Sequence, residues 1–439
     1  MHHKKPEPAR IAAPSIQAKT PPKDGFSSKK NHKPQQKRVQ KSTRTSTRET
    51  SMKLTTLLAA TALSALATAG MAQDALKIGM ITTLSGPAGY LGTDVRDGFL
   101  LAIEEEGGTL GGVPVEVIVE DDGLKPENGR AIAERFLERD EVEIMTGVIF
   151  SNIAPVVAPL TLRAGRFYIS PNSGPSQFAG KACHENYFVA SWQNDTLHES
   201  AGIAASNLGY NNAYILAPNY QAGKDALAGF KRFFTGEIVE ETYTQLGQTD
   251  YAAEIAKIRA AQPEMVFQFL PGGMGINFMK QYDQAGLRDD IPLVLAAPSA
   301  DINILRAVGA SMLGVQNTSH WNHDLDNAAN VAFVASFEET YDRAPTVYAS
   351  QGYDTARLIA SALRATGGAV TEDMDGFRAA LKAADFEAVR GPFAFNTNNH
   401  PIQNWYSREV VEIDGEFRNR TTGIIVENHA DAYVGECEM

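Results

Sequence analysis

The sequence contains few of the residues on which metal sites and nucleophilic catalysis depend. Its 439 residues include only two cysteines and nine histidines, and the histidines are scattered along the chain. His320 and His323 are neighbours, but no further Cys or His pair has the spacing of a zinc site, and no G-x-S-x-G motif occurs. We therefore expect no metal centre, no cofactor and no enzyme activity.

Glycine-rich phosphate loops are missing as well. Residues 107–112 read GGTLGG and residues 272–275 read GGMG, but neither gives a G-x-G-x-x-G pattern after a first strand. The first segment is better explained as the end of a helix followed by a turn. A dinucleotide-dependent oxidoreductase is therefore disfavoured.

Basic residues are scarce after residue 72, and long hydrophobic runs are missing there. Residues 1–51 hold 13 of the 40 Lys and Arg but only three of the 52 acids, so the remainder is more acidic than the net charge of −12 suggests. Without a long basic run, nucleic-acid binding is disfavoured. No apolar stretch there is long enough to span a bilayer. We expect a soluble product with two domains.

The N-terminal region divides into two segments. Residues 1–51 are basic and rich in Pro, Ser, Thr and Gln, without apolar periodicity, which predicts disorder. Residues 52–72 hold one basic residue, a short apolar run and small residues at the end, which is typical of a secretory signal peptide. We interpret Met52 as the true start, residues 1–51 as an over-called extension, and the product as periplasmic. The alternative is a basic cytoplasmic tail ahead of a signal anchor.

Strands and helices alternate with short loops through most of the remaining chain. Buried strands are expected at 76–82, 113–120, 143–147 and 167–170, and the rhythm restarts after Trp192, where Asp195 is expected to cap a helix. This alternation is the pattern of a parallel α/β sheet. The fold class is therefore α/β, with two Rossmann-like three-layer lobes.

The C-terminal third is expected to complete these lobes. Three helices without intervening strands should cover the first lobe, and short antiparallel strands should extend the second. The chain would cross between the lobes three times, which makes a three-segment hinge. The assigned segments are 73–191 and 322–390 for the N-terminal lobe, 192–321 and 391–427 for the C-terminal lobe, and 428–439 for the tail.

Two consecutive strands of the first lobe end in small polar residues. The first strand runs into Phe150-Ser151-Asn152, and the second into Pro171-Asn172-Ser173-Gly174-Pro175. In an open parallel sheet, ligands bind beyond the carboxyl ends of the strands, near helix N-termini that favour anions. We interpret this stretch as half of a small-molecule cleft. The alternative is that Ser151 and Asn152 only cap the next helix.

Several motifs, in order, resemble the periplasmic substrate-binding proteins of branched-chain-amino-acid-type ABC importers. They are Ser85-Gly86-Pro87, Gly111-Gly112 before a strand ending in Asp121-Asp122, Pro126, Gly147 with Ser151, and Ile169-Ser170-Pro171. The resemblance covers Leu76 to Val426 and implies the type I periplasmic binding protein fold. It implies a monomer that holds a small carboxylate between its lobes and delivers it to an ABC permease and ATPase. A periplasmic ligand sensor for a signalling partner has the same fold and is the alternative class.

The resemblance also assigns roles to individual residues. It places Ser151 and Gly174 at the ligand carboxylate, with Phe150, Asn172 and Ser173 beside them. Gly174 has no hydroxyl, so its N–H and the Ser173 hydroxyl are expected to substitute.

The second lobe departs from the amino-acid-binding members. The aromatic position of their ligand loop corresponds to Ala222, with Tyr220 nearby, and the acidic partner of the ligand ammonium is missing at Ala297, with no carboxylate before Asp301. A buried, unpaired ammonium would cost several kcal/mol. We therefore favour a ligand without an α-amino group, an aromatic or related organic acid. Branched-chain or other amino acids are the alternative.

The candidate ligand-binding residues follow from these motifs and from aromatic and amide residues in the cleft loops. They are Tyr90, Phe150, Ser151, Asn152, Asn172, Ser173, Gly174, Tyr220, Gln221, Gly272, Ala297, Trp321 and Gln351. Alternatively, Tyr90 and Tyr220 are ordinary loop residues, Asn172 and Gln221 are amides that stabilise their loops, and Trp321 packs in the hinge.

The two cysteines, Cys183 and Cys437, are an even pair in an exported chain. A disulfide between them would tie the last residues to the N-terminal lobe. Two unpaired thiols are the alternative, because the sequence does not supply the geometry.

Overall fold

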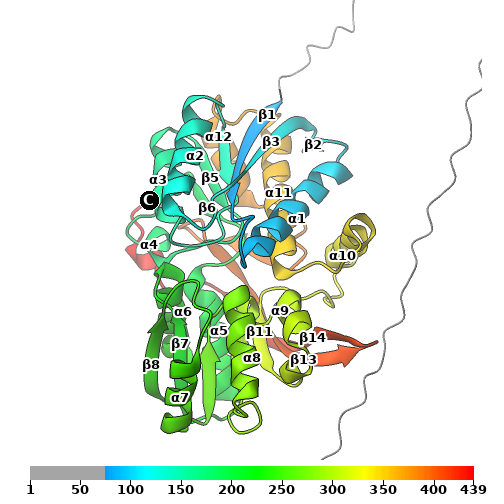
Figure 1. Cartoon of the computed structure of the whole chain (residues 1–439). Coiled ribbons are helices and arrows are strands. Elements are labelled where there is room, and N and C mark those ends of the chain that lie inside the picture. Colours follow the sequence, from blue (N-terminus) through cyan, green and yellow to red (C-terminus); the bar gives the residue numbers. More distant parts are fainter. Residues whose placement is uncertain (1–74) are drawn as a thin grey trace, which may run out of the picture. The chain divides into compact units, whose positions relative to one another are not determined.

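A computed structural model describes residues 75–439 of the chain. The predicted extension 1–51 and signal peptide 52–72 lie outside the described residues. The described residues belong to one compact unit, in which the sheets of two lobes are each flanked by helices (Figure 1). The predicted α/β fold with Rossmann-like lobes is confirmed. Within the described range, no helix combines the length and apolar character needed to cross a membrane.

The first lobe is built on a six-stranded sheet. Its order is β2-β3-β1-β4-β5-β6, and every pairing is parallel except the one between β2 and β3. The strands are β1 (Leu76–Thr82), β2 (Thr109–Leu110), β3 (Val113–Asp121), β4 (Ile144–Thr146), β5 (Phe167–Ser170) and β6 (Tyr187–Val189). β4 and β5, which precede the predicted half-cleft, are therefore neighbours, and their carboxyl ends lie at the same sheet edge.

Helices pack in pairs against this sheet. α1 lies against α11, and α2 lies against α3. Gly79 of β1 faces α2 so closely that a Cβ there would lie 2.5 Å from Cδ2 of Phe136. The helices are α1 (Gly89–Glu105), α2 (Pro126–Glu138), α3 (Ala154–Arg163), α4 (Ser176–Ala179), α10 (Ala328–Tyr341), α11 (Val347–Thr366) and α12 (Met374–Ala383). As predicted, no strand separates the last three.

The second lobe has two sheets joined by one bridge. β8-β7-β9 is parallel, and an isolated parallel bridge from Val266 to Leu293 connects it to β10-β11-β13-β12, with β14 paired to β13. The strands are β7 (Asn212–Pro218), β8 (Glu237–Thr244), β9 (Met265–Gln268), β10 (Val294–Ala296), β11 (Gln316–Ser319), β12 (Phe393–Phe395), β13 (Pro401–Ile413) and β14 (Glu416–His429). β13 and β14 form the predicted antiparallel edge.

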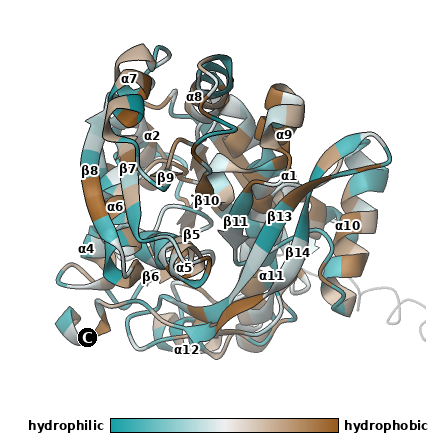
Figure 2. Cartoon of the chain, turned by 90° about the horizontal axis from the view of Figure 1, so that it is seen from below, coloured by the Kyte–Doolittle hydropathy of each residue, from teal (hydrophilic) through white to brown (hydrophobic). Residues whose placement is uncertain are grey.

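The helices of the second lobe also occupy two layers. α5 and α6 pack on each other and α5 contacts β10 and β11, while α8 contacts both α7 and α9. They are α5 (Asn194–Asn207), α6 (Gln221–Phe233), α7 (Ala252–Ala261), α8 (Gly273–Gln284) and α9 (Ile302–Val308), with short 3-10 turns η1 (Ala297–Ser299), η2 (Gly309–Met312) and η3 (Val434–Glu436). Figure 2 shows the central strands β9 and β10 in brown, in keeping with their burial on both faces.

Asp195 does not cap α5, contrary to the expectation. The N-cap is two residues earlier, at Gln193, which has extended backbone angles and whose side chain accepts a hydrogen bond from the N–H of Thr196. Asp195 lies in the first turn, where its carboxylate pairs with Arg232 of α6. This pairing holds α5 to α6 behind the interlobe face.

The third crossing between the lobes lies along β13. β12 still contacts the first lobe, where Phe395 packs edge-on against Phe188, and the N–H of Val189 donates to the carbonyl of Asn399. Farther along β13, Arg408 pairs with Asn317 of β11 in the second lobe. The exact lobe boundaries, including the start of the last C-terminal-lobe segment at residue 391, stay a prediction.

Candidate functional site

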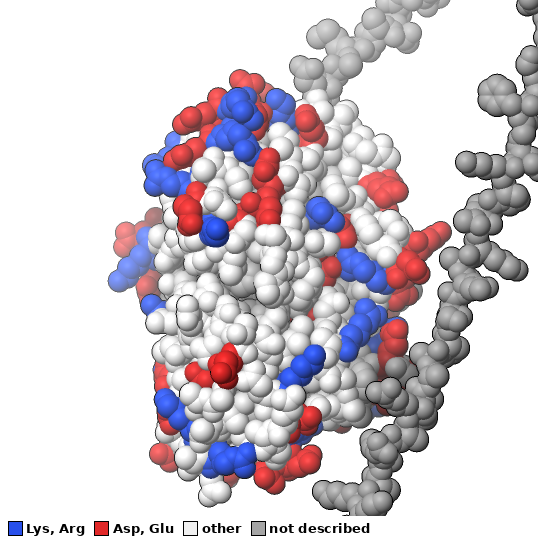
Figure 3. All heavy atoms as spheres, in the orientation of Figure 1, with Lys and Arg blue, Asp and Glu red and all other residues white. Residues whose placement is uncertain are grey.

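A small cavity lies between the two lobes. Sites for small molecules are concave and lined mostly by apolar and aromatic side chains with a few polar groups, and this cavity has that character. Its lining comes from both lobes and from the first crossing between them: Leu91, Ile149, Phe150, Ser151, Asn172, Trp192, Asn194, Leu197, His198, Tyr220, Ala222, Phe269, Pro271, Pro298 and Tyr348. None of these described residues is Asp, Glu, Lys or Arg. On the face seen in Figure 3, the front centre is mostly uncharged, and charged side chains lie at both ends and along the right-hand side.

Ser151 stands at the polar end of the cavity. Its Oγ lies 2.7 Å from Oγ of Ser173 and accepts a hydrogen bond of 3.1 Å from Nδ2 of Asn194. Neither Ser151 nor Asn152 caps α3, whose N-cap is Ile153 without a side-chain cap bond. When Ser173 is the donor to Ser151, the Ser151 hydroxyl hydrogen is left for the cavity. The N-terminus of α3 follows directly, and its dipole favours a negative charge there.

Gly174 supports this end through its backbone. A Cβ at this position would lie 2.2 Å from the carbonyl oxygen of Trp192, so no side chain fits. Its N–H donates to Oδ1 of Asn194 at 3.1 Å, and its carbonyl accepts from the Asn194 N–H at 2.8 Å. The Gly174 N–H that the sequence assigned to the ligand is therefore engaged by Asn194. The close approach of two backbones explains why glycine replaces the hydroxyl residue.

Aromatic rings form a continuous wall on the other side of the cavity. The centroid of Tyr220 lies 6.2 Å from that of Phe150 and 6.3 Å from that of Phe269, to which it is nearly parallel. His198 packs edge-on against Phe269 with centroids 4.7 Å apart. Burial lowers the pKa of His198 to about 3 and raises the pKa of Tyr220 and Tyr348 well above the usual value. The wall is therefore uncharged at neutral pH.

Four of the predicted ligand residues line the cavity: Phe150, Ser151, Asn172 and Tyr220. Ser173 and Gln351 each lie one hydrogen bond behind it, and Gln221 lies farther away. Ser173 contacts Ser151, as described above, and Gln351 accepts a 2.7 Å hydrogen bond from Asn172. Gln221 donates to Oδ1 of Asp225 at 2.8 Å instead of reaching the cavity.

The remaining predicted residues lie outside the cavity lining. The hydroxyl of Tyr90 donates to Oδ2 of Asp301 at 2.8 Å, across the two lobes. Ala297 and Trp321 line a separate small cavity with Asp301. Nε1 of Trp321 donates to Asn330, which supports the alternative of hinge packing.

Asn152 and Gly272 also lie outside this lining. Oδ1 of Asn152 is buried and has no hydrogen-bond partner in residues 75–439. Gly272 has a left-handed φ of 68° and follows Pro271, which does line the cavity. Its backbone conformation therefore shapes the loop instead of contacting the ligand space.

The sequence prediction missed several lining residues, among them Trp192, Asn194, His198, Phe269 and Tyr348. Three of them belong to the first crossing and to α5. The structure buries the first nine residues of α5, although they include Asn, Asp, His and Glu. The sequence signal was this run of polar residues just after the first crossing. Buried polar residues need specific partners, which marks such a helix as more than a core element.

The carboxylates of Asp301 and Asp225 lie just behind the cavity, and both accept hydrogen bonds from donors of the protein. Oδ2 of Asp301 accepts from Tyr90, and Oδ1 accepts from the N–H groups of Asn303 and Ile304. The oxygens of Asp225 accept from Gln221 and Asn194 and from two donors of Ser176, its N–H and its hydroxyl. Within residues 75–439, no cluster of three metal-ligating side chains occurs.

Comparison with known proteins places this architecture in a family. A sequence profile described as periplasmic binding protein matches residues 75–416. The chain belongs to the periplasmic binding protein family. This periplasmic binding protein is 28% identical over 374 residues to Leu/Ile/Val-binding protein homolog 6 of Brucella melitensis, covering 83% of this chain and 95% of that protein.

Solved structures agree with this assignment. The protein is similar to the solute-binding protein of an ABC transporter from R. palustris in complex with benzoate, with 30% identity, a TM-score of 0.79, and coverage of 83% of this chain and 100% of that one. It is also similar to an ABC transporter solute-binding protein from Rhodopseudomonas palustris BisB5 in complex with 3,4-dihydroxybenzoic acid, with 29% identity, a TM-score of 0.75, and coverage of 82% and 99%.

These comparisons confirm the predicted class. The chain is a leucine-binding-protein-like, type I substrate-binding protein of an ABC transporter. Its relatives are solute-binding proteins, and the family is periplasmic.

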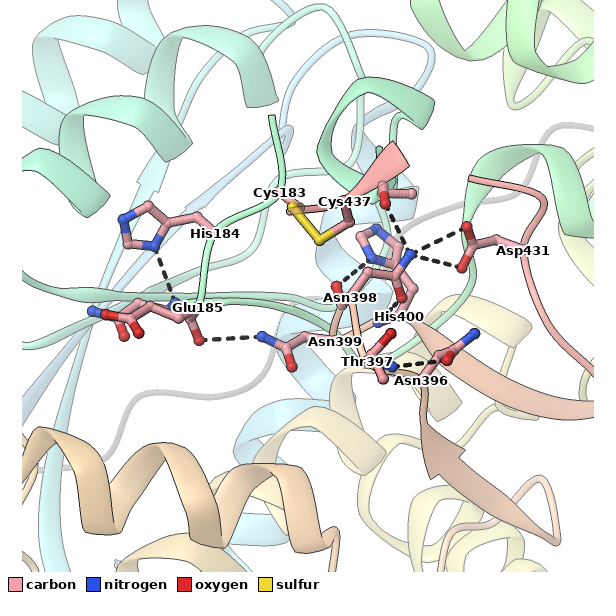
Figure 4. Close-up of a disulfide and its surroundings, with 12 residues drawn as sticks. Cys183, His184, Glu185, Asn396, Thr397, Asn398, Asn399, His400, Asp431 and Cys437 are labelled. Atoms are coloured by element: carbon pink, nitrogen blue, oxygen red, sulfur yellow. Dashed lines mark hydrogen bonds between the residues drawn. A yellow bond between two sulfur atoms is a disulfide. The ribbon is translucent and has the colours of Figure 1, made fainter. Parts of the chain in front are cut away.

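The two cysteines form a disulfide between Cys183 in the first lobe and Cys437 near the C-terminus. Figure 4 shows the bond above the loop 396–400, where Nδ2 of Asn398 donates to the carboxylate of Asp431 at 3.0 Å. Tyr433 of the same tail donates to Asp195 of α5 at 2.8 Å. The tail therefore contacts both lobes away from the cavity.

Proposed function

We propose that this protein binds an aromatic monocarboxylate without an α-amino group in the interlobe cavity and delivers it to an ABC permease and its ATPase. The ligand ring lies against the aromatic wall of Phe150, Tyr220 and Phe269. Its carboxylate accepts hydrogen bonds at the end formed by Ser151 and Asn194. The lobes close around it, and the closed monomer is presented to the permease.

One observation carries the proposal. The cavity is walled by rings and neutral polar groups, and the two acids behind it, Asp225 and Asp301, already accept three or more hydrogen bonds each. Among residues 75–439, no carboxylate lines the cavity to pair with a ligand ammonium, and the two behind it are already contacted by protein donors. An amino acid would bury that charge uncompensated, at a cost of several kcal/mol, whereas a plain acid carries no such group.

A second candidate is a branched-chain amino acid. It is favoured by the relative named Leu/Ile/Val-binding protein homolog 6. The apolar lining, with Leu91, Ile149 and Leu197, suits such a side chain. The missing ammonium partner argues against it.

A thermal-shift panel distinguishes the two. The purified protein is heated with benzoate, 4-hydroxybenzoate, cyclohexanecarboxylate, leucine, valine and phenylalanine. Ligand present at a thousand times its Kd stabilises the native state by about 4 kcal/mol. We expect stabilisation by the aromatic acids and none by the amino acids. Phenylalanine is the matched control, because it joins an aromatic ring to an α-amino acid. Stabilisation by leucine or valine alone would overturn the proposal.

A further inference from the structure

We propose that His198 sets the specificity of the cavity by forming a hydrogen bond with a polar substituent para to the ligand carboxylate. The preferred ligand is then a 4-hydroxylated aromatic acid. The inference rests on the proposed function and names the substrate class for the same cavity.

The first argument is the position of His198 on α5. Asn194 and His198 are four residues apart, so they lie on the same face of the helix, one turn from each other. Both line the cavity. Four residues of helix rise about 6 Å, which is comparable with the separation between two para substituents on a benzene ring. A carboxylate held beside Asn194 and Ser151 therefore directs its para position toward His198.

The second argument is the hydrogen-bonding state of the His198 ring. The residue is 1% exposed, and its Nδ1 is buried without a partner in residues 75–439. Nε2 is not among the fully buried unpartnered atoms, and we assign this more accessible nitrogen to the cavity. Burial keeps the ring neutral, with a pKa lowered to about 3. A neutral imidazole offers one donor or one acceptor per nitrogen, which suits a phenol hydroxyl, and it is no counter-ion for a carboxylate.

The third argument is the fixed orientation of the imidazole. Its ring packs edge-on against Phe267 and Phe269, with centroids 5.7 Å and 4.7 Å away. Phe269 in turn stacks with Tyr220, whose hydroxyl takes part in no described hydrogen bond. A ring clamped in this way is pre-organised, so a ligand hydroxyl gains its hydrogen bond without ordering the side chain. A ligand without the hydroxyl leaves a buried polar atom unpaired.

The test is isothermal titration calorimetry with benzoate, 3-hydroxybenzoate and 4-hydroxybenzoate at pH 7. We expect the wild-type protein to bind 4-hydroxybenzoate about tenfold more tightly than benzoate, as one buried hydrogen bond implies. The 3-hydroxy isomer should resemble benzoate. His198→Phe keeps the aromatic packing and should abolish the preference for 4-hydroxybenzoate over benzoate.

Two further variants make the result unambiguous. His198→Gln places an amide nitrogen near the position of Nε2 and should retain part of the preference, even if His198→Phe fails to fold. His184→Phe makes the same exchange in a loop outside the cavity lining and should change nothing. Equal wild-type affinity for benzoate and 4-hydroxybenzoate, or an unchanged preference in folded His198→Phe, would overturn the inference. Failure of all three acids to bind would instead refute the proposed function.

Discussion

At the scale of single residues, the cavity depends on a short chain of neutral hydrogen bonds. Asn194 donates from one nitrogen to both Ser151 and Asp225, at 3.1 Å and 2.9 Å, and so connects an oxygen of the first lobe with an acid of the second. Ser151 is 1% exposed, and hydrogen bonds to a charged ligand are stronger when both partners are shielded from water. One hydroxyl can therefore contribute much of the affinity.

Ser151→Ala should weaken binding of the aromatic acid by about ten- to hundredfold, the equivalent of one hydrogen bond to a charged group. Calorimetry gives the change in Kd. Ser361→Ala is the matched control, because the Ser361 hydroxyl bonds only the Leu358 carbonyl within α11. Equal affinities of Ser151→Ala and wild-type protein would show that the carboxylate lies elsewhere.

At the scale of elements, α1 and α9 meet across the lobes beside the cavity. Tyr90 of α1 donates to Asp301 at the start of α9, and Asn303 of α9 donates to Asp94 of α1 at 3.4 Å. Burial raises the pKa of Asp301 to about 7 and of Asp94 to about 6. These groups are buried where the lobes touch, so their pKa values depend on closure.

The pH dependence of binding follows from these shifts. When the lobes separate, Asp301 meets water and its pKa returns toward about 4. The closed form then binds a proton that the open form releases, so closure strengthens as the pH falls toward 5. We expect the affinity for benzoate to rise up to about tenfold between pH 8 and pH 6. Calorimetry at a series of pH values measures the rise.

The matched variant for this prediction is Asp301→Asn, which keeps the shape of the side chain and removes its titration. Its binding should vary much less with pH than that of the wild-type protein. The residual slope belongs to Asp94 and to Asp225, because burial also raises the pKa of Asp225, which accepts hydrogen bonds from Ser176 of the first lobe. Arg408 and the neighbouring Tyr90 and Tyr348 stay in one protonation state below pH 8. An identical pH profile in both proteins would contradict the assignment.

At the scale of the whole molecule, the C-terminal tail connects the lobes outside the hinge strands. Cys437 bonds Cys183 of the first lobe across 254 residues of sequence. His429 and Tyr433 contact the second lobe through Glu199 and Asp195 of α5. Closing so long a loop constrains the unfolded chain far more than it changes the native one.

Cys437→Ser should therefore lower the free energy of unfolding by about 2–5 kcal/mol. Urea denaturation followed by circular dichroism measures the loss. Reductant should destabilise the wild-type protein to the same level and leave the variant unaffected. The Kd for benzoate should stay within about twofold, because neither cysteine lines the cavity. Equal stability of oxidised wild-type and variant proteins would show that the bond does not contribute.

The sequence by itself determined the fold and the first-lobe half of the cavity. The spacing of apolar residues along the chain predicts the alternation of strands and helices. The strand ends at Phe150-Ser151 and at Asn172 are close in sequence, so their common position could be predicted too. The lack of an acidic residue at Ala297, where a ligand ammonium would need a partner, could also be read from the sequence around that position. These features need no knowledge of distant contacts.

Only the tertiary structure decided which groups meet across the cleft. Asn194 reaches Ser151 and Gly174 from another element, and His198 and Tyr348 arrive from α5 and α11. It also showed that Tyr90 and Gln221 donate hydrogen bonds to Asp301 and Asp225 instead of lining the cavity, and that the Gly174 N–H donates to Asn194. Such pairings join residues that are distant in sequence and depend on how the two lobes pack against each other. The periodicity of the sequence carries no information about that packing.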